Sequence, residues 1–308
     1  MSQIRLFNWA WSKYLYLDKI NNILKDKNYN QVIDWFLGSW NLLLNINVNA
    51  KKFIWYDIIK LLPNIYSYID DYNYSLSDIN DIINEYDNFK DKTQYYNFRN
   101  NWNFLYKHDD YSKKFIIMTI LLLKMCSNSM VRFNKKGEFN QWFRWTKDTN
   151  IWFFKSSKTS ENILIEINKI ISKKSETQYV FKNKDLMVDL KKYNNKNTLL
   201  LLDPPYVISH WKESLYGTWD KDWNDKKEKE LLDFLLNDFK GDFIYFNYLE
   251  IIYPDKTIEH NILKEFLVKH EGKYKKSLNL HPLREQVSTW QKRKGTKDAK
   301  EFIITNIF

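Results

Sequence analysis

A run of four leucines at residues 199–202, followed by Asp203-Pro204-Pro205-Tyr206, constrains the fold of this chain more than any other segment. A short apolar run of this kind is typical of a strand buried on both faces, as in a parallel sheet covered by helices. Two consecutive prolines lack the N–H groups that a strand needs. We therefore predict a buried strand that stops at Asp203 and presents this carboxylate at its carboxyl end.

The rest of the chain favours an α/β sheet. Runs rich in β-branched and aromatic residues predict strands at residues 31–34, 53–57, 243–246 and 302–305. Apolar residues recur at helical spacing over 17–24 and 231–239, and this alternation predicts helices on both faces of the sheet. Residues 63–175 have helical periodicity and few strand signals, so they predict an inserted, mainly helical domain. Residues 1–62 and 176–308 would form the discontinuous core.

Three aspartates directly follow apolar runs, so each should lie at the carboxyl end of a strand: Asp34, Asp57 and Asp203. Any one of them can simply cap the next helix. Ligands of open α/β sheets bind at the carboxyl edge of the strands, so three acids together favour a ligand crevice.

The Asp-Pro-Pro-Tyr segment suits alkylation of an exocyclic amine on a base. The nitrogen lone pair is delocalised into the ring, and two acceptors can draw its N–H bonds out of the plane. Asp203 and the carbonyl of Pro204 would be these acceptors, Pro205 would stiffen the turn, and Tyr206 would stack on the base. A base inside a duplex must be flipped out to reach such a site.

Basic residues are clustered. The net charge is +10, and residues 130–158 and 282–300 contribute +5 and +4 of it. Aromatic residues interleave with the first cluster, which predicts a polyanion-binding surface, although a solvated basic face is the alternative. The lone Cys126 excludes a disulfide framework and a cysteine-rich zinc site. We expect it to be a small buried hydrophobe, and we expect no metal.

The apolar composition of 44% excludes a disordered chain. The longest apolar run is too short for a bilayer, and the start lacks a basic region followed by an apolar stretch. We therefore expect a soluble protein without a membrane partner.

These motifs, in this order over nearly the whole chain, resemble the Dam-type (D12 class) DNA adenine-N6 methyltransferases, which use S-adenosylmethionine. Asn8-Trp9-Ala10-Trp11-Ser12-Lys13 is similar to the first cofactor segment of the family, and residues 34–41 are similar to its acidic, glycine-rich loop. The resemblance implies a doubly wound, mostly parallel Rossmann-like sheet with the insert as DNA-recognition domain. It implies cofactor contacts by Trp9, Lys13, Asp34, Phe36, Gly38, Asp57, Ile58 and Asp185.

Residues 132–140, inside the first basic cluster, resemble the DNA-reading hairpin of the family. The resemblance implies that Phe133 wedges or stacks at the flipped site and that Asn134 contacts DNA. Double-stranded DNA is the expected partner, and the protein is expected to be a cytoplasmic monomer of bacterial or phage origin. The implied DNA contacts are Arg132, Phe133, Asn134, Lys135, Lys136, Phe139 and Asn140.

Tryptophan stands at two glycine positions of the cofactor segments, Trp11 and Trp40. The chain has 6 glycines and 13 tryptophans, where average usage predicts roughly 22 glycines. One interpretation is a catalytically inactive relative that still binds DNA or a partner subunit. The other is an active enzyme whose UGA codons specify glycine but are written here as tryptophan.

Methylation of RNA or protein on the same fold is a further alternative for the function of the chain.

Overall fold

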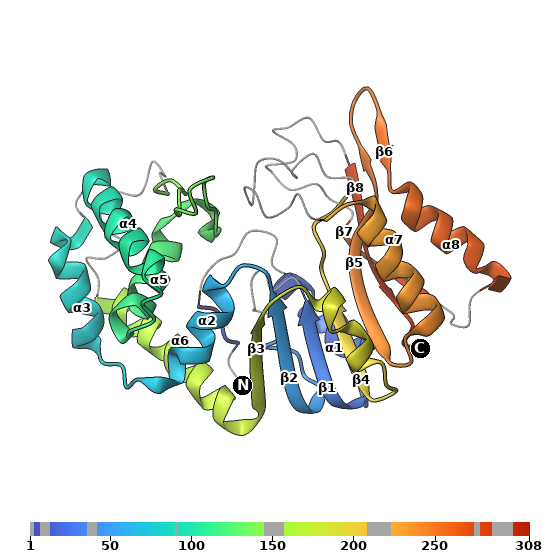
Figure 1. Cartoon of the computed structure of the whole chain (residues 1–308), viewed down its shortest axis with the longest axis horizontal. Helices are drawn as coiled ribbons and strands as arrows, with labels where there is room; N and C mark the ends of the chain where they lie inside the picture. The colour runs from blue at the N-terminus through green and yellow to red at the C-terminus, as the bar shows by residue number, and fades with distance from the viewer. Residues whose placement is uncertain are drawn as a thin grey trace. The chain divides into compact units, whose positions relative to one another are not determined.

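The computed structural model describes residues 3–6, 13–35, 42–89, 91–144, 157–207, 223–273, 278–284 and 298–308. The chain forms two compact units (Figure 1). The first comprises residues 1–17, 38–46 and 59–181, and the second comprises residues 18–37, 47–58 and 182–308. The predicted insert, 63–175, lies entirely within the first unit.

The sheet has the strand order β3-β2-β1-β4-β5-β8-β7, with β6 paired to β5. The pairs β1–β2, β1–β4 and β4–β5 are parallel, whereas β5–β8, β7–β8 and β5–β6 are antiparallel. The mostly parallel α/β architecture predicted from the alternation is thus confirmed. The strands are β1 (Asn28–Trp35), β2 (Asn49–Asp57), β3 (Gln178–Asn183), β4 (Thr198–Leu202), β5 (Asp242–Ile252), β6 (Thr257–Glu259), β7 (Asn279–Arg284) and β8 (Asp298–Thr305).

Burial explains the apolar runs. All five residues of β4 are buried, because this strand lies between β1 and β5 in the middle of the sheet. In β1 and β2 the buried residues concentrate toward the carboxyl ends. The five predicted strands correspond to β1, β2, β4, β5 and β8, while β3, β6 and β7 were not predicted.

The helices of the second unit carry the expected apolar stripe. They are α1 (Leu17–Ile23), α7 (Asp225–Asp233) and α8 (Asn261–Lys273), and a π-helical turn (Phe234–Asp238) continues α7. Leu231, Leu232, Leu235 and Leu236 are all buried, which confirms the predicted helix. Gly241 then leads into β5, where a Cβ atom would lie 2.3 Å from the carbonyl oxygen of Thr198. This close approach requires glycine.

The first unit is mainly helical, with α2 (Leu61–Tyr68), α3 (Leu76–Glu85), α4 (Lys92–Lys107), α5 (Lys113–Met125) and α6 (Ser157–Glu176), and Figure 1 shows α3 to α6 gathered together. Capping boxes at Ser75 and Asp91 start α3 and α4 by satisfying backbone N–H groups. Ten of the 13 residues of α5 are buried, because α5 is the central helix of this unit's core. Trp102 of α4 stacks on Phe115 and donates its indole N–H to Thr119 Oγ1 at 2.8 Å.

Cys126 is fully buried at the end of α5, and burial raises the pKa of its thiol to about 12. The prediction that this cysteine is a small buried hydrophobe is confirmed. Among the helices in the described part of the chain, none combines the length and the apolar character that crossing a membrane requires.

Candidate active site and nucleic-acid interface

The three aspartates lie on one face of the sheet at its carboxyl edge. Asp34 pairs in register with Trp55 of β2 and Leu201 of β4. Asp57 and Asp203 each follow these partners by two residues, so the alternation of side chains along parallel strands puts all three on the same side. Asp57 and Asp203 flank β1 at two strand spacings, about 10 Å apart. The sequence prediction that these acids converge is therefore supported by the strand register.

This edge is also the point where the sheet order reverses. From β1 the chain proceeds to β2 on one side, and β4 and β5 follow on the other. Asp34 and Asp203 belong to the two neighbouring strands at this reversal. In open α/β sheets such a switch point opens a crevice beyond the strand ends, which makes it the candidate ligand site.

Asp34 is 6% exposed, and its pKa is raised well above the usual value, first by burial and then by the charges of Asp203 and Asp57. Burial penalises the charged form, and the two neighbouring carboxylates repel it. This edge of the sheet therefore favours a cation or hydroxyl groups over a further anion.

We expect Asp34→Asn to raise the melting temperature of the ligand-free protein. The folded pKa exceeds the ordinary 3.8, so stability is lost as the pH rises through the folded pKa. The neutral amide of asparagine carries no charge that burial would penalise. The melting temperature at pH 8 should therefore rise by roughly 2–5 °C, and the rise should be smaller at pH 4. Differential scanning fluorimetry at both pH values tests this.

The matched control is Asp81→Asn, which replaces an exposed aspartate of α3 and should leave the melting temperature unchanged at both pH values. A lower melting temperature for Asp34→Asn at pH 8 would show that the fold already compensates the Asp34 charge.

The Asp-Pro-Pro-Tyr segment begins where β4 ends. Pro204 is buried, and Asp203, Pro205 and Tyr206 are half-buried. The Tyr206 hydroxyl lies 3.0 Å from Asp203 Oδ1 and 2.8 Å from Glu301 Oε1 on β8. The Tyr206 ring packs edge-on against Tyr248, with ring centroids 4.8 Å apart. The structure thus links Asp203 and Tyr206 directly, and it adds Glu301, which the sequence reading missed.

A second carboxylate that sequence reasoning missed is Glu228 of α7, which is fully buried. His260 Nδ1 accepts the backbone N–H of Leu263 at 3.2 Å, and its Nε2 lies 3.3 Å from Glu228 Oε1. The groups around Glu228 connect α7 and α8 to β5. The groups around the Glu228 carboxylate are Trp223 Nε1 at 2.7 Å, Asn247 Nδ2 at 2.9 Å, His260 Nε2 at 3.3 Å and the hydroxyl of Tyr245.

The backbone after β2 is fixed from β3. Asn183 donates to the carbonyl oxygens of Asp57 and Ile58, both at 3.0 Å. Ile58 is 38% exposed, which leaves an apolar side chain beside Asp57. Asp185 caps a 3₁₀ turn by accepting from Met187 N at 2.9 Å, and its other oxygen pairs with Lys227 at 3.3 Å. Asp185 therefore has local structural contacts where the resemblance implies a cofactor contact.

Several predicted cofactor residues cannot be placed with these acids. Lys13 starts a 3₁₀ turn (Lys13–Tyr16) and is 6% exposed within the first unit. Trp9, Phe36 and Gly38 lie outside the described residues, as do Trp11 and Trp40.

The predicted hairpin at residues 132–140 is present. Phe133 and Phe139 form an antiparallel bridge, and Gly137 turns the chain with a φ of +72°. Lys135, Lys136 and Gly137 are exposed at the tip, while Arg132 and Asn140 are half-buried. The hairpin thus presents two lysines to solvent.

Three of the residues implied as DNA contacts have structural contacts within the first unit. Phe133 and Phe139 are 3% and 1% exposed and pack on Trp102. Asn134 accepts from the backbone of Lys136 at 2.8 Å and of Glu138 at 3.0 Å, and its amide donates to Glu138 at 3.0 Å. A wedge role for Phe133 would require the ring to leave the core.

One stripe of α4 anchors the hairpin and the residue that follows it. Four side chains spaced by four residues lie on one face of α4 and contact the segment 138–141 in antiparallel order. The contacts are Tyr95 OH to Gln141 O at 2.9 Å, Arg99 Nη1 to Gln141 O at 3.0 Å, Asn103 to both backbone groups of Phe139 at 2.7 and 3.1 Å, and Lys107 to Glu138 at 2.9 Å.

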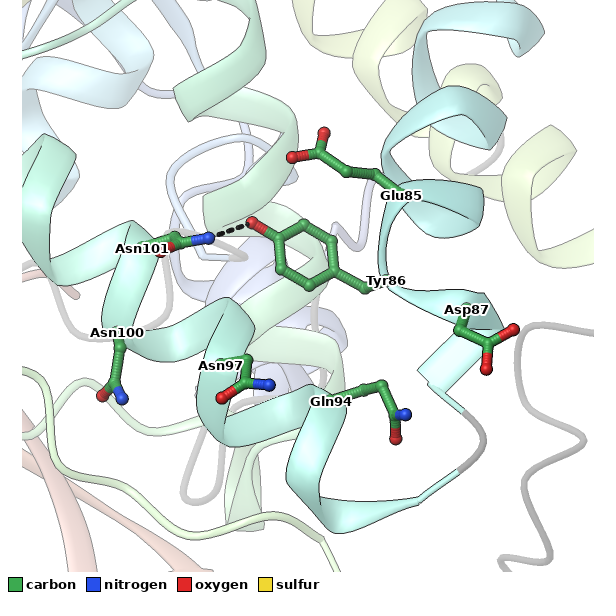
Figure 2. A pocket seen from close by; sticks show the side chains of 7 residues that line it. All are labelled: Glu85, Tyr86, Asp87, Gln94, Asn97, Asn100 and Asn101. Carbon is green, nitrogen blue, oxygen red and sulfur yellow. Dashed lines mark hydrogen bonds between the residues drawn. The ribbon is translucent and has the colours of Figure 1, made fainter.

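Among the described residues of the first unit, two cavities bear on the search for a site. The larger, about 610 Å³, lies between the end of α3 and α4, where Asn101 donates to the Tyr86 hydroxyl at 2.8 Å (Figure 2). Glu85 and Asp87 at its rim do not suit a phosphate, and none of the predicted site residues lines it. The second, about 300 Å³, lies between α4 and the hairpin and includes Asn134, Phe139 and Asn140 in its lining. Asn140 Oδ1 is buried beside it without a hydrogen-bond partner among the described residues.

Comparison with known proteins finds relatives of this chain. The chain is 26% identical to the modification methylase StsI of Streptococcus sanguinis and 25% identical to the type II methyltransferase M.FokI of Planomicrobium okeanokoites, over 97% of its own length in both cases. It spans 42% of the length of each of these relatives. It is 27% identical to the type II methyltransferase M.MjaIII of Methanocaldococcus jannaschii, over 73% of this chain and 77% of that protein. The sequence model of the D12 class family matches residues 9–277, and the chain therefore belongs to the D12 class of N6 adenine-specific DNA methyltransferases.

Proposed function

We propose that this chain transfers a methyl group from S-adenosylmethionine to N6 of an adenine that is flipped out of a specific site in duplex DNA. The observation that carries the proposal is the position of Asp203-Pro204-Pro205-Tyr206. This segment leaves the central strand β4 at the switch point of the sheet, beside Asp34 and in register with Asp57. The protein would act as a monomer in the cytoplasm of a bacterial cell, encoded by the bacterium or by a phage.

The described residues fit the cofactor. S-adenosylmethionine carries a sulfonium, an ammonium group and a ribose diol, and it supplies the methyl group when bound. Asp34, with its raised pKa, lies where a cation relieves carboxylate repulsion. Asp57 would accept from the ribose hydroxyls, and the exposed Ile58 would cover an apolar surface of the adenine. Lys13, Asp185, Trp9, Phe36 and Gly38 remain cofactor contacts that only the resemblance implies.

The chain's own groups would act on the target amine. The Asp203 carboxylate and the Pro204 carbonyl would accept hydrogen bonds from the two N–H groups of N6. These hydrogen bonds would make the lone pair of the nitrogen available for the methyl group. Pro205 holds the carbonyl rigid, and Tyr206 offers its ring to the base. Proximity and orientation then carry the rate, without a covalent intermediate.

The hairpin would contact DNA through its exposed tip. Lys135 and Lys136 would neutralise phosphates, and Arg132 and Asn140 would reach phosphates or base edges. The orphaned Asn140 Oδ1 supports this role, because a base amino group is a suitable donor for it.

Replacing both tip lysines by glutamine should weaken DNA binding for all sequences alike. The logarithm of the binding constant decreases with the logarithm of the salt concentration, and each phosphate contact contributes about −0.9 to this slope. Losing two contacts should therefore make the slope less steep by roughly 2. Fluorescence anisotropy of labelled duplexes at several salt concentrations measures it. The control is Lys240→Gln, an exposed lysine next to the amino end of β5. An unchanged slope would identify the tip as an ordinary solvated surface.

A DNA-binding protein without activity is the second candidate, and the tryptophans at positions 11 and 40 favour it. Methyl transfer from labelled cofactor to duplex DNA, RNA and protein, followed by identification of the methylated nucleoside, distinguishes the candidates. Formation of N6-methyladenine in DNA supports the proposed function. DNA binding without any transfer supports the second candidate.

A further inference from the structure

The hydroxyl of Tyr206 lies between two carboxylates of the second unit. Asp203 Oδ1 is 3.0 Å away and Glu301 Oε1 is 2.8 Å away. A phenol has one proton to donate. The phenol can therefore donate its hydrogen bond to only one of the two carboxylates at a time. The other carboxylate then keeps one more lone pair for a different donor.

The sheet fixes Glu301 in this position. Glu301 is 5% exposed, lies on β8 and pairs in register with Tyr248 of β5. Tyr248 in turn packs edge-on against Tyr206 at 4.8 Å. Burial, followed by the charges of Asp203 and Glu301, raises the pKa of Tyr206 well above its ordinary value. The hydroxyl thus remains a proton donor throughout the working pH range.

We propose that Glu301 is a positioning residue that takes the Tyr206 proton and so keeps the Asp203 carboxylate available for the adenine amino group. This inference rests on the proposed function for the identity of the amine. Without Glu301 the phenol would donate to Asp203 and compete with the substrate for the same oxygen. Glu301 acts through Tyr206 and does not need to touch the base.

A kinetic cycle tests the proposal. Glu301→Gln should lower kcat about tenfold, with little change in KM for the cofactor or in DNA affinity. In a Tyr206→Phe background, which has no phenolic proton, the same substitution should have no further effect on kcat. The matched control is Glu250→Gln, a carboxylate of the same sheet that pairs with Lys300 and Lys264, and kcat should not change. An equal loss of kcat in both backgrounds would overturn the proposal.

A second measurement does not depend on activity. In protein labelled with ¹³C at the Cζ of tyrosine, the signal that Tyr206→Phe removes reports the Tyr206 hydrogen bond. Glu301→Gln should shift this signal more than Asp203→Asn does. The reverse order would overturn the proposal. If the unmodified protein transfers no methyl group, the proposed function fails, while this signal still decides whether Glu301 holds the Tyr206 proton.

Discussion

Asp203→Ala should lower methyl transfer by about a thousandfold and leave the affinity for duplex DNA unchanged. The substitution removes a carboxylate acceptor at the end of β4, where the amine would have to be polarised. The hairpin tip, which we propose to contact DNA, belongs to the other compact unit, so its contacts should persist. Single-turnover transfer and anisotropy on the same duplex measure the two effects separately.

The controls for Asp203 separate chemistry from folding. Asp255→Ala replaces an exposed aspartate of the same unit and should leave transfer unchanged. Asp203→Asn retains one oxygen acceptor without charge, so it should fall between the alanine variant and the unmodified protein. Retained transfer in Asp203→Ala would remove this residue from the proposed mechanism.

Local sequence patterns were sufficient to predict the central sheet. The strands β1, β2, β4, β5 and β8 carry concentrated apolar runs because they are buried by neighbours on both sides. The edge strand β7 includes Pro282, which only an edge or an irregular pair tolerates. The edge strand β3 shows only partial burial and β6 has three residues, so neither produces a strong pattern.

The residues of the candidate site were predictable only where a local sequence pattern marks them. Asp34, Asp57 and Asp203 were predictable because each directly follows an apolar run in the sequence. Glu301 lies 95 residues from Tyr206 in the chain, and only the antiparallel pairing of β8 with β5 brings the two together. No local spacing signals such a contact.

The hairpin shows a different limit. Its basic and aromatic composition predicted a polyanion-binding surface, but composition does not distinguish an exposed ring from a buried one. Phe133 and Phe139 pack on Trp102 of α4, a helix whose four-residue stripe of anchoring side chains is polar or aromatic rather than apolar. The hairpin itself was expected from the resemblance, whereas its packing on α4 was not predicted.

The retained glycines bear on the tryptophan question. Gly137 has a positive φ, and a Cβ at Gly241 would collide with a backbone oxygen. Trp102 and Trp223 are buried and donate their indole N–H groups to Thr119 and Glu228. These two indoles therefore have structural roles that glycine cannot fill, whereas Trp11 and Trp40 stand at positions where the sequence resemblance implies glycine.

We expect the double variant Trp11→Gly/Trp40→Gly to bind S-adenosylmethionine at least tenfold more tightly than the chain as written. A cofactor loop must approach its ligand closely, which a large side chain obstructs. Isothermal titration calorimetry of both proteins tests this. Equal, tight binding by both would show that the indoles do not obstruct the cofactor.

The same substitution elsewhere is the control, and the gene provides an independent test. Trp102→Gly or Trp223→Gly should destabilise the fold by roughly 3–5 kcal/mol, as buried aromatic truncations do, and should not improve cofactor binding. If UGA specifies glycine in the source, the codons at positions 11 and 40 should be UGA and those at 102 and 223 should be UGG. UGG codons at positions 11 and 40 would exclude recoding. The chain would then be interpreted as an inactive DNA-binding protein, unless calorimetry shows tight binding of S-adenosylmethionine to the chain as written.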